Sequence, residues 1–455
     1  MFIVDDGVFS YKETSVYFSI RRLGRYMPSY SFPRNILLFL LSVLVYYVSC
    51  LPCNGTQMQS EQPGDSKRTT FDIIWSSLAT IFACIWVAIH PNVPGPNLVK
   101  KGWFYVSVLR RTELMIVTVF APEVITIWAF RQFFTARSIH KLSPKTLSLK
   151  HGFLVSMGAF EFSDHCPVTR QDLEDDDGLV IRLGTITKEE IDDRNKGDGL
   201  SKGAAIIQAT WFLMQCAARL KFNLPITILE AIAVGYAVFT VINYAAWWHK
   251  PLGISIPFSA GIASPLMLER QRLPTLLPEK LRASYLLDWV DFRLLSTFFG
   301  GDVIEHVAGP SKDEGAPRLW SGHKNDVNLF YVVTSGALFG TLFGGVHCAA
   351  WNSHFPTSIE RDLWRVSSLY IALIPIPIII MTFGAEKLAD RFGLVGSEEK
   401  DNTWFGGMYR LLWIIFYLVY IVARGFLLLE PFLAMRSLPP CAFVDIAWTN
   451  FLPHV

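Results

Sequence analysis

Long apolar stretches alternate with polar ones along most of this chain. A helix needs about 20 mainly apolar residues to cross a bilayer, so each apolar stretch of that length predicts a membrane span. About seven such spans follow residue 70, and we expect them at 72–90, 113–134, 203–221, 226–247, 327–350, 364–384 and 408–434. The hydrophobic pattern therefore predicts an all-α protein, a polytopic transmembrane helix bundle.

A shorter apolar run at residues 36–50 comes before these spans. It has about 15 residues and follows Arg34, which is typical of the apolar region of a signal sequence. We expect it to be either a cleaved signal peptide or a retained signal anchor. Because the stretch before it is long for a signal sequence, translation starts either at Met1 or at Met27, which begins an ordinary one.

The alternation of apolar and polar stretches also suggests how the chain is divided. Two polar segments, 135–202 and 248–326, are longer than ordinary loops, so we expect them to fold outside the membrane or to carry function. The expected parts are an N-terminal extension with the signal peptide or anchor (1–52), a short luminal segment (53–70), the first four spans with loop 135–202 (71–247), the polar extramembrane loop (248–326), and the last three spans with the C-terminal tail (327–455).

One predicted span carries a ladder of glycines at Gly336, Gly340 and Gly344. Glycines four residues apart lie on one face of a helix and let a neighbouring helix approach closely, which is how helices pack in lipid. A buried helix of a soluble protein would instead lose about 1 kcal/mol of helix propensity at each glycine. The ladder therefore favours a membrane protein and predicts a helix-packing face.

Charged residues and a glycosylation sequon predict an orientation. The sequon at Asn54 favours a luminal location for the segment before the first span. The connection 91–112, with its lysines and arginines, then falls in the cytosol, as the positive-inside rule requires, and so does the C-terminus. Four basic residues fall on the luminal side instead: Arg131, Arg137, Lys141 and Lys145. This conflict indicates either that 151–162 re-enters the membrane or that the orientation is inverted.

Composition agrees with a membrane protein. Hydrophobic residues make up 51% of the 455 residues and charged residues only 18%, which differs from the usage of soluble domains. The formal net charge is +2 without a basic run or stripe, so we expect no nucleic-acid partner. The seven cysteines have no metal-ligand spacing, although Cys53 and Cys166 could form a luminal disulfide. The expected partners are the lipid bilayer and a lipid or other small ligand, no cofactor is expected, and the sequence carries no signal of oligomeric state.

Several polar side chains lie inside predicted spans, where they are costly unless they are paired or functional. In 203–221, one helical stripe, which we expect to face inward, carries Gln208, Trp211, Gln215 and Arg219. A short hairpin brings the next span alongside, so Arg219 could reach Glu230. The two form a structural pair or a ligand or ion site, or else Glu230 meets water at the interface.

Glu123 directly follows Pro122 near the middle of a predicted span. An unpaired carboxylate at this depth protonates or finds a partner, which makes Glu123 the first candidate for a functional side chain. The alternative is a structural carboxyl, hydrogen-bonded beside a proline kink. Second-rank candidates are Asn243, His347 and Arg424, because a single polar group of this kind is more often a helix-packing group than a functional one.

Catalytic signatures are weak in this sequence. It has no nucleophile elbow, zinc-protease motif, phosphate-binding loop or dinucleotide-binding motif. Asp288 and Asp291 have the spacing with which a membrane prenyltransferase would hold magnesium diphosphate. A single pair with this spacing is far from specific and remains a weak metal-site candidate.

Segments 75–96, 186–220, 244–258, 423–440 and 448–455 form a distinctive set. Together they resemble a family of functionally uncharacterised multi-pass membrane proteins of mushroom-forming (basidiomycete) fungi, from residue 71 to the C-terminus. The resemblance implies a fungal membrane protein that enters the secretory pathway and resides in the endoplasmic reticulum or plasma membrane. It implies no catalytic residue, because the family has no assigned activity.

Three functions remain as hypotheses. The first is transport or ligand sensing through an internal polar site that includes Glu123, Glu230 and the stripe on 203–221. The second is an intramembrane enzyme that acts on a lipid or isoprenoid, with protonated Glu123 as general acid. The third is a non-catalytic scaffold in which the polar groups only pair helices.

Overall fold

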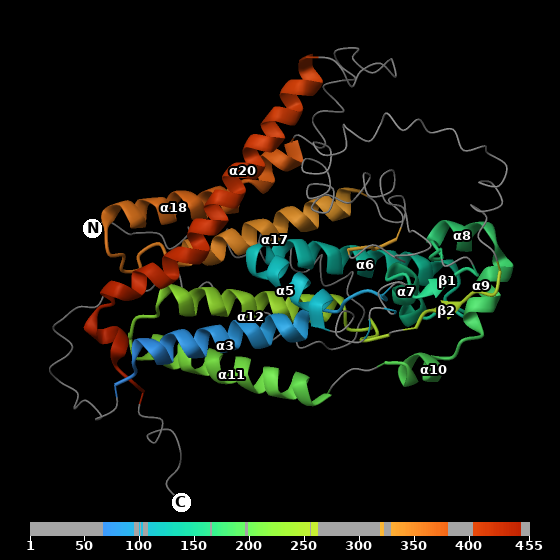
Figure 1. The fold of residues 1–455 in the computed structure, drawn as a ribbon, viewed down its shortest axis with the longest axis horizontal. Helices are drawn as coiled ribbons and strands as arrows, with labels where there is room; N and C mark the ends of the chain where they lie inside the picture. The colour runs from blue at the N-terminus through green and yellow to red at the C-terminus, as the bar shows by residue number, and fades with distance from the viewer. Residues whose placement is uncertain are drawn as a thin grey trace, which may run out of the picture. The chain divides into compact units, whose positions relative to one another are not determined.

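The computed structural model describes residues 67–94, 100, 102, 108–163, 166–195, 199–254, 256–262, 319–322, 329–380 and 404–446. These residues form twelve α-helices and one pair of two-residue strands (Figure 1). The prediction of an all-α protein is therefore confirmed. The predicted signal region, Asn54, and the pair Asp288 and Asp291 lie outside the described residues.

Among the described residues, five helices are long and apolar enough to cross a membrane. They are α3 (Thr70–Ala88), α12 (Ile228–Ala246), most of α17 (Leu329–Ala349), a segment that begins with α18 (Ser358–Leu373) and continues to Ile380, and the larger part of α20 (Trp404–Leu433). A further helix, α11 (Gly199–Lys221), packs against α3. The capping box between Thr69 and Asp72 fixes the start of α3.

Two helices, α5 (Arg110–Phe120) and α6 (Pro122–Leu142), replace the single straight span expected at 113–134. They are bent by 115° relative to each other. The bend follows from Pro122, which has no N–H to donate and whose ring clashes with the preceding turn. The backbone therefore leaves the first helix at Ala121 and starts a second one in a new direction.

The start of α5 and the middle of α6 both lie at the C-terminal end of α3. Arg111, at the start of α5, donates a hydrogen bond to the carbonyl of Trp86 at 2.6 Å. Gln132, at the middle of α6, donates to Asn92 Oδ1 at 2.8 Å, just beyond the end of α3. The pair thus enters and leaves the bundle at the same end, so the straight second span expected from the sequence is wrong.

The first and last described segments meet at the opposite end of the bundle. Lys67, before α3, forms an antiparallel bridge with Val444, and Arg68 N donates to the carbonyl of Phe443 at 3.1 Å. An odd number of crossings between these segments would place them on opposite sides of a bilayer. The expected count of seven spans is therefore incompatible with this contact.

A separate group of short elements follows α6. It contains α7 (Leu149–Ser156), β1 (Phe160–Glu161), α8 (Arg170–Asp175), α9 (Asp177–Gly184), α10 (Lys188–Asp193) and β2 (Phe258–Ser259), whose strands pair in parallel (Figure 1). Its core includes Leu154, Phe160 and Ile191, which are fully buried. Parts of both long polar segments therefore fold together, and the apolar stretch 151–162 packs in this core, which explains its apolarity without membrane re-entry.

Two 3₁₀ turns, Ala434–Ser437 and Pro440–Phe443, follow α20. Cys441 in the second turn is disulfide-bonded, whereas Cys166 is not. The disulfide that the sequence left possible between Cys53 and Cys166 is therefore not formed.

Candidate functional site

The break between α5 and α6 leaves backbone carbonyls without helical partners inside the bundle. A buried carbonyl away from water must find a donor elsewhere. Tyr236 of α12 donates to the carbonyl of Val119 at 2.5 Å. Arg424 of α20 donates to the carbonyls of Val119 and Phe120 at 3.2 and 2.5 Å. Two helices that are distant in the sequence therefore hold the broken end in place.

Glu123 lies in the first turn of α6, directly after this break, and is only 4% exposed. Tyr420 of α20 donates a hydrogen bond to its Oε1 atom, whereas its Oε2 atom is buried and has no hydrogen-bond partner. Arg424 attracts Glu123 electrostatically, and the N-terminus of a helix adds partial positive charge. The negative charge of the carboxylate is therefore compensated, while one of its acceptor atoms stays unused.

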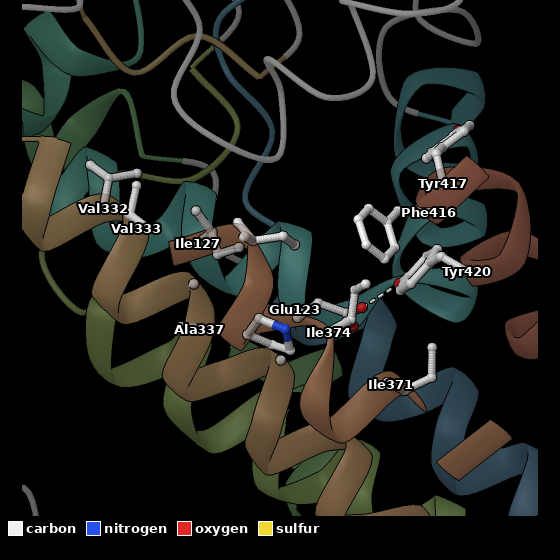
Figure 2. Close-up of a pocket in the computed structure, with 14 residues that line it drawn as sticks. Glu123, Ile127, Val332, Val333, Ala337, Ile371, Ile374, Phe416, Tyr417 and Tyr420 are labelled. Carbon is white, nitrogen blue, oxygen red and sulfur yellow. Dashed lines mark hydrogen bonds between the residues drawn. The ribbon is translucent and has the colours of Figure 1, made fainter. Parts of the chain in front are cut away.

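Glu123 lines a partly open cavity (Figure 2). The walls come from α6, α17, α20 and the end of the span that begins with α18. Most of the lining is apolar and includes Ile127, Val332, Val333, Ile371, Ile374 and Phe416. Figure 2 shows the hydrogen bond between Tyr420 and Glu123 at this cavity, which Tyr417 also lines.

The predicted glycine ladder borders the cavity. Gly336 and Gly340 line it, and an added Cβ atom would lie 3.0 Å from a side-chain carbon of Ile127 at the first position and of Pro375 at the second. At Gly344, one turn further along, an added Cβ would lie 2.3 Å from the backbone nitrogen of Ala372. The glycines therefore allow α17 to pack closely against α6 and α18 beside the cavity.

Glu230 and Arg219 do not line this cavity. Glu230 forms an ion pair with Arg68 at 2.5 Å. Arg219 donates to backbone carbonyls instead, those of Pro225 at 2.9 and 3.0 Å and of Val444 at 2.8 Å, and attracts Glu230 only from farther away. The close ion pair of Glu230 is therefore with Arg68, which precedes the first span, and not with the expected candidate Arg219.

The stripe expected on α11 does not face inward as a whole. Gln208 and Gln215 are half-buried, and Trp211 on the same stripe is 43% exposed. Gln208 donates to Thr80 Oγ1 of α3 at 3.1 Å. The buried positions of α11 are Ala205, Phe212, Cys216 and Arg219. The buried face of α11 is therefore rotated from the predicted one, and Arg219 is the residue that the two faces share.

Asn243 and His347 are buried but do not line the cavity. Asn243 Oδ1 has no hydrogen-bond partner. His347 Nδ1 donates to the carbonyl of Phe343 at 2.9 Å, and its Nε2 has no partner. Arg424 lies over the ring of Phe343 at 4.5 Å. Across the part of the chain that the structure describes, no three His, Cys, Asp or Glu side chains gather in a way that could hold a metal ion.

Sequence analysis missed a second buried polar cluster, centred on Lys250. This side chain is 5% exposed, and its Nζ donates to the carbonyl of His90 at 2.5 Å, to Gln132 Oε1 at 2.8 Å and to Asn92 Oδ1 at 3.2 Å. The faces of two tryptophan rings lie 4.5 and 4.6 Å from the same ammonium, those of Trp128 and Trp247. Burial lowers the pKa of Lys250 well below its usual value. The signal that could have found it is a lone lysine two residues after a pair of tryptophans, Trp247 and Trp248.

The chain belongs to a family of unknown function, DUF8562, whose family model matches residues 37–151, 177–263 and 324–455. These ranges include every residue that lines the cavity. No curated protein and no solved structure matches the chain. The functional argument therefore rests on the cavity and the buried groups around it.

Proposed function

We propose that this member of the DUF8562 family is a multi-pass membrane protein that binds a lipid-like ligand in the cavity beside Glu123 and transports or senses it. The observation that carries the proposal is Glu123, which lines an apolar cavity and whose Oε2 atom is a buried acceptor without a partner. Such an unsatisfied group costs about 1–3 kcal/mol. A ligand that donates a hydrogen bond would remove this cost.

A bundle of six crossings would set this cavity inside the membrane. In this arrangement α3, α11, α12, α17, α18 and α20 each cross once, and the bent pair α5–α6 re-enters without crossing. An even count agrees with the bridge between Lys67 and Val444. Broken helices at membrane depth are tolerated where they line a cavity and often lie at the binding sites of transporters, which supports a ligand site at the break.

The disulfide at Cys441 supports a luminal location for this end of the bundle, because disulfides persist in oxidising compartments. The C-terminal tail would then be luminal, and the elements α7 to α10 would be cytosolic. This orientation moves the basic residues after the bend to the cytosolic side, as the positive-inside rule requires: Arg131, Arg137, Lys141 and Lys145. It favours a membrane of the secretory pathway.

Native mass spectrometry of the purified full chain, incubated with a total cell lipid extract, tests the proposed function. Wild-type protein should carry a lipid adduct after the detergent is removed, and Ala337→Phe, which places a ring in the cavity from α17, should lose it. Glu430→Gln is the matched control, because Glu430 is a fully buried carboxyl on α20 that does not line the cavity. The proposal is wrong if wild type carries no adduct or if Ala337→Phe retains it.

A further inference from the structure

We infer that the ligand of this cavity is an apolar molecule with one neutral hydroxyl group, which donates a hydrogen bond to Glu123. The inference rests on the function proposed above, since it specifies the class of ligand for the same cavity. Three properties of the cavity support it: the acceptor that is unused, the charge around Glu123, and the apolar walls.

The carboxylate of Glu123 offers one unused acceptor. Its Oε1 atom already accepts the hydrogen bond of the Tyr420 hydroxyl, and a phenol has only one proton to donate. Its Oε2 atom is buried without a partner. The polar end of the ligand must therefore donate a hydrogen bond, which a hydroxyl or an amine can do and an ether cannot.

The charge around Glu123 distinguishes the hydroxyl from the amine. Arg424 is 1% exposed and attracts Glu123, while its own Nε and Nη2 atoms are held by the carbonyls of Phe120 and Val119. The positive end of the α6 dipole lies at the same carboxylate. Because these groups already balance one negative charge, an ammonium would bring an uncompensated charge into a desolvated site. A neutral hydroxyl would not.

Aromatic rings are the one feature of the cavity that also suits a cation. Phe416, Tyr417 and Tyr420 line it, and aromatic rings attract ammonium groups. The same buried region already holds a cation on an aromatic face, since Arg424 lies over Phe343 at 4.5 Å. The charge balance at Glu123 therefore favours a hydroxyl more than the aromatic rings favour an ammonium. Binding of an amine is a separate outcome of the test below.

An anionic head group fits this cavity worst. A carboxylate or a diphosphate beside Glu123 would place two negative charges together in a site of low dielectric constant. The remaining wall has aliphatic side chains that suit alkyl or ring carbons, among them Ile127, Val333 and Ile374. The ligand therefore carries its polar group at one end only, and the lipid diphosphates of the enzyme hypothesis do not fit here.

Four probes that share one chain test this inference: hexadecan-1-ol, its methyl ether, hexadecylamine and hexadecanoic acid. Native mass spectrometry titrations of the full chain give the affinity of each. Wild type should bind the alcohol at least about tenfold more tightly than the ether, because the ether makes no hydrogen bond to the charged acceptor. The amine and the acid should also bind more weakly than the alcohol. Glu123→Gln keeps the shape but removes the charge, so it should reduce the preference for the alcohol, whereas Glu430→Gln should preserve it.

The outcomes separate the ligand class from the function. If the ether binds as tightly as the alcohol, or the amine binds more tightly, the inferred hydroxyl is wrong. The proposed function survives that result as long as Ala337→Phe abolishes binding. If the probes bind wild type and Ala337→Phe equally, or do not bind wild type at all, both the inference and the proposed function are wrong.

Discussion

Replacing Gly344 with alanine should separate two helices that the structure holds in backbone contact. The new Cβ atom would lie 2.3 Å from the backbone nitrogen of Ala372 and 2.4 Å from its Cα, whereas ordinary contact begins at 3.4 Å. Backbone atoms cannot rotate aside as a side chain can. Helices α17 and α18 must therefore move apart locally by about 1 Å, which is the overpacking that destabilises well-packed interiors.

This movement would also weaken two hydrogen bonds between the same helices. Trp364 Nε1 donates to the carbonyl of His347 at 3.1 Å, and Thr341 Oγ1 donates to the carbonyl of Ala372 at 3.0 Å. Overpacking costs about 1–3 kcal/mol, and a hydrogen bond contributes about 0.5–1.5 kcal/mol. After an offset of about 1 kcal/mol for the better helix propensity of alanine, we expect Gly344→Ala to lower the free energy of unfolding by about 1–5 kcal/mol.

Gly345→Ala is the matched control, because no atom lies within 4 Å of the added Cβ there. It should be neutral, or stabilising by up to about 1 kcal/mol through helix propensity. Titration with SDS in mixed micelles, followed by tryptophan fluorescence, measures the free energy of unfolding of both variants. Equal stability of Gly344→Ala and Gly345→Ala would refute the backbone contact and, with it, the packing that borders the cavity.

Three further predictions concern the lysine cluster, helix α7 and the topology. Lys250→Met should lower the free energy of unfolding by about 1–3 kcal/mol, because three buried acceptors each lose one hydrogen bond, although Gln132 Oε1 and Asn92 Oδ1 keep those from Trp247 and Gln132. The exposed Lys188→Met should leave it unchanged, and equal thermal midpoints would contradict the cluster. Burial lowers the pKa of His151 from its ordinary 6.5. As the pH falls, the unfolded chain therefore binds a proton before the folded chain does, and the folded state loses stability. Hydrogen exchange in α7, corrected for its intrinsic rate, should speed up below pH 6.5 but not above it. Single cysteines at Lys145 and Asp445 should be labelled from opposite faces of sealed vesicles, and labelling from one face would contradict six crossings.

Glu123 could be selected from the sequence, but its surroundings could not. A carboxylate after a proline in an apolar stretch is conspicuous because an unpaired charge is costly there. Tyr420, which donates to it, is 297 residues away in the chain. Arg424 reaches Phe120 across 304 residues. Contacts of this separation depend on how α20 packs against the broken helix, which no local pattern of residues encodes.

The bend at Pro122 shows how one local feature changes the topology. The proline indicates that a helix bends or ends, but the angle of 115° depends on donors for the freed carbonyls. Those donors are Tyr236 and Arg424, both from distant helices. With the bend, α5 and α6 together return to the end of the bundle at which they entered. Every later element therefore lies at the opposite end from the one that a single straight span would give it.

Ion pairing at Glu230 was mispredicted for a related reason. The sequence offered Arg219 as the nearest cation across a short hairpin, but Arg68 occupies the carboxylate at 2.5 Å. Arg219 is engaged with the tail, where the carbonyl of Val444 accepts its hydrogen bond. The two arginines and the tail meet only because the first and last described segments pair, which is a long-range contact.

A photoreactive alcohol tests the proposed cavity most directly. A hexadecan-1-ol analogue with a diazirine in its chain, irradiated with the full chain in lipid nanodiscs, should label cavity residues such as Val333 and Ile374, and excess hexadecan-1-ol should compete. Ala337→Phe should lose this labelling and keep the background at residues outside the cavity such as Val422, which is 72% exposed. Labelling confined to such exposed residues, and equal in both proteins, would contradict a ligand site beside Glu123.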